Sequence, residues 1–284
     1  MRKAKLLLQK AQQEGYAIPA FNYADIWEIK AIVEAAQEEN APVIVASIPK
    51  VVEAHSLDVC AAMVSSVAAQ AGVPVIHHLD HSTSVEVCKQ AVSCGYDSVM
   101  FDGSKLSLEE NIEKLREVVA FAHGKDVCAE GEIGQIMGRG YEGTYEGGEY
   151  LAATSDAVEL ATKSGVDSLA VGIGTAHGFY KGKPKLNFDR LQEIYNANPM
   201  PLVLHGGTGI PVDDVQKSIS IGICKVNVGT AILQAHLEGI REMVGNEGFV
   251  HIVDINLAAK DKIKQVVREA IRMCMAQGKA GNER

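Results

Sequence analysis

Three histidines that follow apolar segments are the strongest chemical signal in the chain. His81 comes after VPVIHHLD, His177 after VDSLAVGIGTA and His205 after PMPLVL. Short apolar runs of this kind are typical of buried parallel strands, so each imidazole is expected at the carboxyl end of a strand. Three imidazoles that meet there, with a fourth position open, would form a catalytic zinc site. Three unrelated histidines, in the core or on loops, are the alternative.

Asp80 directly precedes the first of these histidines, in the segment HLDHS. Alternate side chains of a strand share a face, so Asp80 and His81 diverge unless the strand ends between them. At a strand end both could turn into one cavity, where a carboxylate beside a zinc ligand can move a proton or orient the ligand. His77 and His78 are expected to pack and to form hydrogen bonds.

Two glycine-rich turns have the composition of phosphate-binding segments. One is HGGTG at 205–209, and the other is NVGT at 227–230, which precedes a predicted helix. Backbone N–H groups at helix N-termini favour anions, and the loops after strands seven and eight commonly hold phosphate in parallel barrels. Lys181 could add a cation, although a solvated lysine is the ordinary expectation for a loop position.

The elements that must position these residues alternate between strand and helix. Helical spacing is clear at 26–39 and 108–122, where apolar residues recur on one face. Eight strand-like runs with helices between them predict an α/β fold, a (β/α)8 TIM barrel, with residues 1–284 as a single domain. The expected strands are 17–21, 42–46, 73–79, 98–101, 127–132, 168–172, 202–205 and 223–228.

One irregular segment interrupts this alternation. The loop 134–149 follows the fifth strand, and residues 134–148 include six glycines. A long loop on the active-site face is expected to close as a lid over substrate. An ordered surface excursion is the alternative.

Composition excludes several classes of function. The chain has 284 residues, is 47% hydrophobic and carries a formal net charge of −9, which argues against a nucleic-acid partner. No apolar run approaches the roughly 18 residues of a membrane helix, so no membrane association is expected. The first residues, MRKAKLLLQKAQQEG, are expected to form an amphipathic helix rather than a signal peptide. Six cysteines without a C-x-x-C pair predict free thiols in a reducing cytoplasm.

An ordered set of motifs along nearly the whole chain resembles one enzyme family. The motifs are AFN, PVIVAS, HLDHS, SVMFDGS, AEGEIG, GVDSLAVGIGTAHG, PLVLHGGTGIP and KVNVGT. Together they resemble the class II, zinc-dependent ketose-bisphosphate aldolases, and most of all the shorter branch that includes tagatose-bisphosphate aldolases. The resemblance implies reversible cleavage of a ketose phosphate to dihydroxyacetone phosphate and an aldehyde, as in carbohydrate metabolism and glycolysis.

The resemblance also implies a role for individual residues. His81, His177 and His205 match the zinc ligands, and Asp80 matches the acid/base that exchanges a proton with the hydroxyl at the cleaved bond. Asp102 and Glu132 match acidic positions that can hold the metal in a second, buried location. The family also binds a monovalent cation, Na⁺ or K⁺, near the phosphate, and forms dimers and tetramers. Positions around the substrate match Asn22, Ser47, Gly178, Lys181, Gly206, Gly207, Thr208, Asn227, Gly229 and Thr230.

Two departures from the family pattern concern the substrate. The family uses a loop glutamate to exchange the proton on the dihydroxyacetone phosphate carbon, but Arg139 and Gly140 stand near that position. Glu142 is the first substitute, followed by Glu146 and Glu149. The alternative is that all three glutamates are solvated surface residues with no catalytic role.

The second departure lies near the C-terminal helix. Leu257 stands where the family often has an arginine for the far phosphate. Arg139 or Lys260 could compensate, or else the aldehyde half lacks a phosphate. Two other readings of the chain stay open: a zinc hydrolase of a phosphorylated substrate, and a sugar-phosphate-binding relative that has lost turnover.

Overall fold

The computed structural model describes residues 2–134, 136, 151–180, 182–245 and 250–281. Within these residues eight parallel strands form a closed barrel in the order β1 to β8, and β8 pairs with β1 to complete it. The predicted (β/α)8 fold is therefore confirmed. The strands are β1 (Ile18–Asn22), β2 (Val43–Ser47), β3 (Val75–Ser82), β4 (Ser98–Phe101), β5 (Cys128–Ile133), β6 (Ser168–Val171), β7 (Leu202–Leu204) and β8 (Ile223–Val228).

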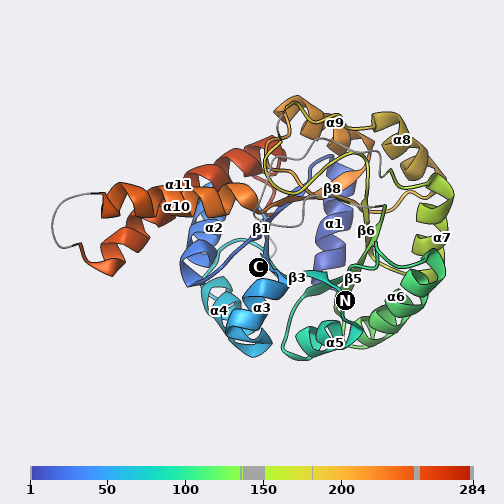
Figure 1. The fold of residues 1–284 in the computed structure, drawn as a ribbon, viewed down its shortest axis with the longest axis horizontal. Coiled ribbons are helices and arrows are strands. Elements are labelled where there is room, and N and C mark those ends of the chain that lie inside the picture. The colour runs from blue at the N-terminus through green and yellow to red at the C-terminus, as the bar shows by residue number, and fades with distance from the viewer. Residues whose placement is uncertain (1, 135, 137–150, 181, 246–249, 282–284) are drawn as a thin grey trace.

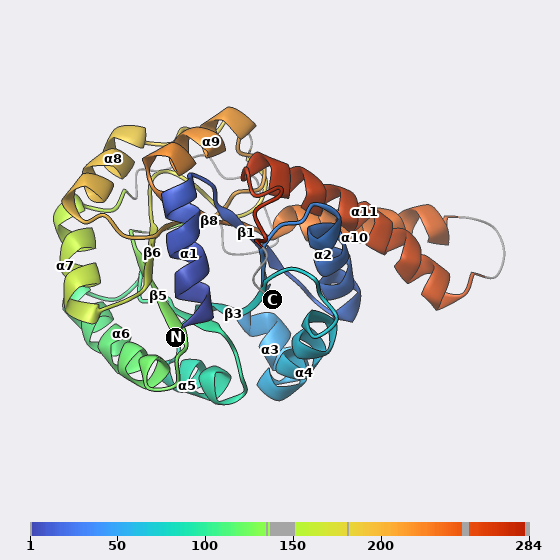
Figure 2. The same cartoon turned by 180° about the vertical axis from the view of Figure 1, so that it is seen from behind.

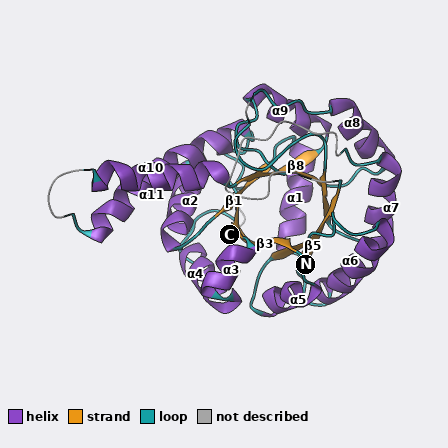
Figure 3. Ribbon diagram, viewed as in Figure 1, coloured by secondary structure: helices purple, strands orange, loops and turns teal. Residues whose placement is uncertain are grey.

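Helices surround the barrel as a continuous outer layer (Figure 3). Side-chain capping fixes where several of them begin: Asp25 and Glu28 form a capping box at α2, and Ser107 and Glu110 form another at α6. The helices are α1 (Lys3–Glu14), α2 (Ile26–Glu38), α3 (Pro49–His55), α4 (Leu57–Ala68), α5 (Val85–Ser93), α6 (Leu108–His123), α7 (Thr154–Ser164), α8 (Phe188–Ala197), α9 (Val212–Ile221), α10 (Thr230–Val244) and α11 (Ile252–Met273).

Helix α1 covers the end of the barrel where the strands begin, as the view in Figure 2 shows. Lys3 Nζ donates to the carbonyl of Val75 at the start of β3 (3.0 Å), and Lys5 Nζ lies 3.0 Å from Asp167 just before β6. The amphipathic helix expected at the start of the chain thus closes one end of the barrel and leaves the other end for the site.

Helices α10 and α11 form a hairpin that extends away from the barrel (Figure 1). Its base packs against α2, where Lys260 Nζ binds both carboxylate oxygens of Glu34 at 2.8 and 2.9 Å. Of the side chains farther along, Val244 is 62% and Ile252 63% exposed. An unusual share of apolar surface therefore faces outward on this hairpin.

The six cysteines have no disulfide partner, and all but the half-buried Cys94 are buried. Burial raises the pKa of the Cys88 and Cys274 thiols to about 12, which keeps both protonated and unreactive. No single helix of the described residues is long and apolar enough to cross a membrane. Helices α3 and α4 meet those limits only as a pair, across a bend of 97°.

Candidate active site

The three predicted histidines meet at the carboxyl ends of the strands. One ring nitrogen from each of His81, His177 and His205 lies within 4.8 Å of the others. His205 Nδ1 and His81 Nε2 are 3.0 Å apart, and the rings of His81 and His177 meet edge-on with centroids 4.8 Å apart. Two nitrogens at Zn–N distances of about 2.05 Å in a tetrahedral shell are separated by roughly 3.3 Å. The donor set and its spacing therefore fit a zinc ion.

The chain brings His81 into the cluster by a local distortion of β3. The strand continues to Ser82 rather than ending at residue 79 as expected, and its pairing with β4 shifts register between Leu79 and Ser82. His81 has a φ of +53°, a left-handed conformation uncommon for residues other than glycine. This irregularity lets Asp80 and His81, adjacent in sequence, both contact groups of the site.

The other two histidines lie beyond their strands. His205 directly follows β7 and is fully buried, whereas His177 lies six residues after β6, in a loop. The expectation that His177 would sit at the end of its strand is therefore wrong. Within this loop, the amide of Ala176, next to His177, donates to the Tyr180 hydroxyl (2.9 Å).

Asp80 is buried between two amides. Asn22 Nδ2 donates to Asp80 Oδ2 at 2.9 Å, and Asn227 Nδ2 donates to Oδ1 at 3.2 Å. Burial opposes the charged form of Asp80, but the neighbouring histidines, His81 first, together with the buried Lys225 ammonium hold the pKa of the carboxyl well below its usual range. Asp80 is therefore ionised at neutral pH and can act as a base.

Two further carboxylates flank the histidines. Asp102 Oδ2 lies 3.0 Å from His81 Nδ1, and Asp102 Oδ1 accepts from the Ser104 hydroxyl at 2.7 Å. Glu132 Oε2 lies 3.8 Å from Nδ1 of both His81 and His205. Burial raises the pKa of Glu132 to about 7, and the nearby carboxylates add to the effect. His81, Asp102 and Glu132 form a second group that could hold a cation.

The two glycine turns lie beside the cluster with little space for side chains. Gly206 has a φ of +70°, and a Cβ there would lie 2.3 Å from the Ala176 carbonyl oxygen. A Cβ on Gly229 would lie 2.4 Å from Asn22 Oδ1. Thr208 Oγ1 accepts from the amide of Ala231 in the first turn of α10 (3.3 Å), which ties the two turns together.

The remaining predicted residues have varied positions. Thr230 begins α10, and Gly178, with a φ of +97°, follows His177 directly. Ser47 is buried at the end of β2 and hydrogen-bonds the Tyr96 hydroxyl at 2.9 Å. Lys181, Arg139, Gly140, Glu142, Glu146 and Glu149 lie outside the described residues, as does nearly all of the loop 134–149.

Two charged residues that none of the sequence motifs indicated lie beneath the histidines, Glu130 on β5 and Lys225 on β8. Both are 1% exposed, and Lys225 Nζ lies 2.8 and 2.9 Å from the two Glu130 carboxylate oxygens. The available signal was spacing: Glu130 stands two residues before Glu132, and Lys225 two before Asn227, so each pair faces the barrel interior. His78 behaves as expected, with hydrogen bonds to Ser98 and to Lys225.

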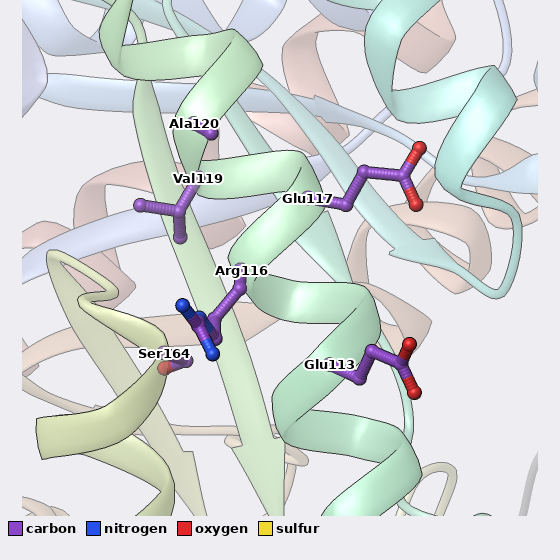
Figure 4. Close-up of a pocket in the computed structure, with 6 residues that line it drawn as sticks. All are labelled: Glu113, Arg116, Glu117, Val119, Ala120 and Ser164. Carbon is purple, nitrogen blue, oxygen red and sulfur yellow. The ribbon is translucent and has the colours of Figure 1, made fainter.

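A hollow on the outer surface is unrelated to this cluster. It lies between α6 and α7 and includes Arg116 and Ser164 (Figure 4). Its lining contains none of the histidines or carboxylates described above.

Fold and site together define a parallel (β/α)8 barrel with a three-histidine cluster able to hold a metal ion, at the end where such barrels carry their active sites. The sequence model for class II fructose-bisphosphate aldolase matches residues 2–279. The chain belongs to this family and is an aldolase, a carbon–carbon lyase of carbohydrate metabolism.

Comparisons with individual proteins support the same family. A protein of Staphylococcus epidermidis named fructose-bisphosphate aldolase is 38% identical over 284 residues, which cover 94% of this chain and 95% of that protein. The crystal structure of the YdjI aldolase from Escherichia coli K12 is 30% identical, with a TM-score of 0.87 over 99% of this chain and all of that one. The fructose-bisphosphate aldolase structure from Campylobacter jejuni shares the fold. It is 22% identical, with a TM-score of 0.81 over 97% of this chain and 95% of that one.

Proposed function

We propose that the protein is a zinc-dependent class II aldolase that reversibly cleaves a ketose phosphate or bisphosphate to dihydroxyacetone phosphate and an aldehyde. The substrate resembles fructose- or tagatose-1,6-bisphosphate, and the reaction has a place in glycolysis or a related sugar pathway. The observation that carries the proposal is the convergence of three imidazoles with the ionised Asp80. The name of the S. epidermidis relative supports the bisphosphate class.

His81, His177 and His205 would hold the zinc ion. When bound, zinc supplies a Lewis acid that stabilises the negative charge left on the dihydroxyacetone phosphate half as the bond breaks. Asp102 hydrogen-bonds the far nitrogen of His81 and so orients that ring. Asp102 and Glu132 would hold the ion in a second, buried position.

Asp80 is the acid/base for cleavage. Its carboxylate removes the proton from the hydroxyl at the bond being broken, and returns a proton in the condensation direction. The amides of Asn22 and Asn227 fix the carboxylate in place. Because Asp80 is already ionised at neutral pH, cleavage can begin without a prior proton loss.

The glycine turns would bind the phosphate of the dihydroxyacetone half. Gly206 is approached closely by the backbone of Ala176 and Gly229 by the side chain of Asn22, so neither position has room for a side chain that would screen its N–H group. The N-terminus of α10 adds its positive dipole. The resemblance adds a monovalent cation, Na⁺ or K⁺, near this phosphate. The proposed substrate-binding residues are Asn22, Ser47, Gly178, Lys181, Gly206, Gly207, Thr208, Asn227, Gly229 and Thr230.

The proton on the dihydroxyacetone phosphate carbon is assigned to Glu142 in the loop 134–149, which closes over substrate. The far phosphate has no assigned cation: Leu257 on α11 replaces the family arginine, and Lys260 is already paired with Glu34. A substrate whose aldehyde half lacks a phosphate is therefore included in the proposed class.

We further propose a cytoplasmic homodimer or homotetramer. Free, buried thiols suit a reducing compartment. The exposed apolar side chains of the α10–α11 hairpin, among them Leu237, Val244 and Ile252, are suited to contact a second copy.

A screen of ketose monophosphates and bisphosphates, coupled to detection of dihydroxyacetone phosphate, tests the function. We expect release of dihydroxyacetone phosphate from at least one ketose phosphate, and no free phosphate. Phosphate release without dihydroxyacetone phosphate would identify a hydrolase. Binding without either product would identify a sugar-phosphate-binding protein.

A further inference from the structure

A buried ion pair lies directly beneath the histidine cluster. Lys225 Nζ donates to both carboxylate oxygens of Glu130, at 2.8 and 2.9 Å, and to His78 Nε2 at 3.1 Å. These three bonds use all the ammonium N–H groups of Lys225. A buried lysine in an aldolase barrel could suggest Schiff-base chemistry, but Nζ of this one is engaged in three hydrogen bonds to Glu130 and His78.

The pair is costly to bury, so its presence calls for a role beyond stability. Removing two charges from water costs several kcal/mol per ion, and apolar replacements of buried pairs are often neutral or stabilising. Glu130 and Lys225 are each 1% exposed, and they come from β5 and β8, which are separated by β6 and β7 in the barrel. Their side chains therefore meet inside the barrel and not between neighbouring strands.

Glu130 connects the pair to a proposed metal ligand. Its Oε1 lies 3.2 Å from His205 Nε2, while its Oε2 also accepts from the Ser168 hydroxyl at 3.1 Å. The other ring nitrogen of His205, Nδ1, lies in the cluster, 3.0 Å from His81 Nε2. A carboxylate at Nε2 favours the tautomer that carries its proton there and leaves the Nδ1 lone pair facing the cluster.

One neighbour favours the opposite tautomer. Asn227 Nδ2 lies 3.4 Å from His205 Nε2 and could donate to that nitrogen. The contact with Glu130 is shorter and involves an ionised acceptor, which makes roughly twice as strong a hydrogen bond. Asn227 Nδ2 also has a better acceptor in Asp80, at 3.2 Å. The shorter contact with Glu130 therefore determines the tautomer of His205.

We propose that Lys225 and Glu130 are positioning residues for the metal site: Lys225 holds the Glu130 carboxylate in place through two hydrogen bonds, and Glu130 holds His205 with its proton on Nε2 and its Nδ1 lone pair toward the metal. The inference rests on the proposed zinc site. On this proposal β5 and β8 contribute in the same way. Glu130 and Lys225 hold His205 from deeper in the barrel, and Glu132 and Asn227, two residues farther along each strand, line the site itself.

The first test reads the tautomer directly. Long-range ¹H–¹⁵N correlation spectra of the metal-free protein, labelled in its nine histidines, would be assigned at His205 by the signals lost in His205→Ala. We expect His205 as a single neutral tautomer with the proton on Nε2. A proton on Nδ1, or a mixture of tautomers, would overturn the inference whatever the behaviour of any other variant.

The second test compares two uncharged double variants by zinc affinity in chelator competition. Glu130→Gln with Lys225→Met retains a carbonyl oxygen for His205, whereas Glu130→Leu with Lys225→Met removes it. We expect the Leu variant to bind zinc about 10–100-fold more weakly than the Gln variant, the usual effect of losing such a partner. Ser98→Ala is the control: it removes a hydrogen-bond partner of His78, which is not a proposed metal ligand, and should bind zinc as the wild type does.

The outcomes separate this inference from the proposed function. Equal zinc affinity of the two folded double variants overturns the positioning role. If instead His205→Ala binds zinc as tightly as the wild type, the proposed zinc site itself is wrong. Should the double variants not fold, the tautomer in the wild-type protein still decides.

Discussion

Replacing Asp80 with asparagine separates the two proton transfers that an aldolase must perform. Asparagine has nearly the same shape but cannot accept a proton at neutral pH. The loss of a general acid/base lowers kcat by roughly 10²–10⁴, which corresponds to about 2.7–5.5 kcal/mol in the barrier. Cleavage of a ketose phosphate should fall by this amount, while the proton on the dihydroxyacetone phosphate carbon, assigned to another group, should still exchange with solvent.

The structure also predicts a cost in stability. Asp80 accepts from Asn22 and Asn227, and an amide can accept from only one of them. One buried amide donor is then left without its acceptor, which destabilises the protein by about 1–3 kcal/mol. The Asp80→Asn protein should therefore fold and retain its zinc.

The assay measures coupled release of dihydroxyacetone phosphate, zinc content and deuterium exchange into dihydroxyacetone phosphate on the same preparation. Asp97→Asn is a matched control, because Asp97 accepts from the His77 amide (2.8 Å) near the opposite end of the barrel. It should leave kcat unchanged. Cleavage within threefold of wild type in zinc-loaded Asp80→Asn would refute the assignment, and loss of both cleavage and exchange would show that Asp80 does not act on the cleaved bond alone.

Three further predictions concern binding and stability. Gly206→Ala should raise the KM for the phosphorylated substrate at least tenfold, because its Cβ would lie 2.3 Å from the Ala176 carbonyl oxygen. Gly15→Ala, at a similar φ with open space around it, should leave the KM unchanged. Unchanged steady-state kinetics in Gly206→Ala would contradict the proposed role of this glycine turn in phosphate binding. Asp167→Ala removes the carboxylate that pairs with Lys5 of α1, and should lower the free energy of unfolding in denaturant titrations by about 1–3 kcal/mol while kcat is retained. An unchanged denaturation midpoint would refute this role of Asp167 in holding α1. Burial lowers the pKa of His78 to about 3, so below about pH 6.5 the unfolded chain binds a proton that the native protein does not. The free energy of unfolding should therefore fall as the pH decreases from about 6.5 toward 3, by up to about 1.4 kcal/mol per pH unit. His78→Gln should show a shallower pH dependence of stability over this range, and an identical slope would argue against a neutral His78.

Much of the barrel could be predicted because parallel strands buried on both faces leave a plain sequence signal. Each predicted strand overlaps an observed one, and the helices at 26–39 and 108–122 correspond to α2 and α6. The end of β3 could not be predicted in the same way. HLDHS is polar and does not resemble a strand, and only its pairing with β4 across a register shift extends β3 to Ser82.

The candidate site divides along a similar line. Chemistry with a local signature, such as Asp80 beside His81 or the turn after His205, could be found from neighbouring residues. The pairing of Glu130 with Lys225 could not: spacing places each on the interior face of its strand, but the two positions are 95 residues apart in sequence and meet only in the folded barrel. The left-handed conformation of His81 is likewise a property of the folded sheet, not of its local sequence.

Removing and restoring the metal decides whether the three histidines hold the ion on which cleavage depends. The protein would be treated with a chelator, dialysed and assayed with fructose and tagatose 1,6-bisphosphates for release of dihydroxyacetone phosphate, before and after addition of one equivalent of zinc. The proposed site predicts loss of activity on chelation, full recovery with zinc, and no recovery in a variant that lacks His81 or His205. Full turnover by the metal-free protein, or zinc-dependent recovery in His205→Ala equal to that of the wild type, would contradict the account.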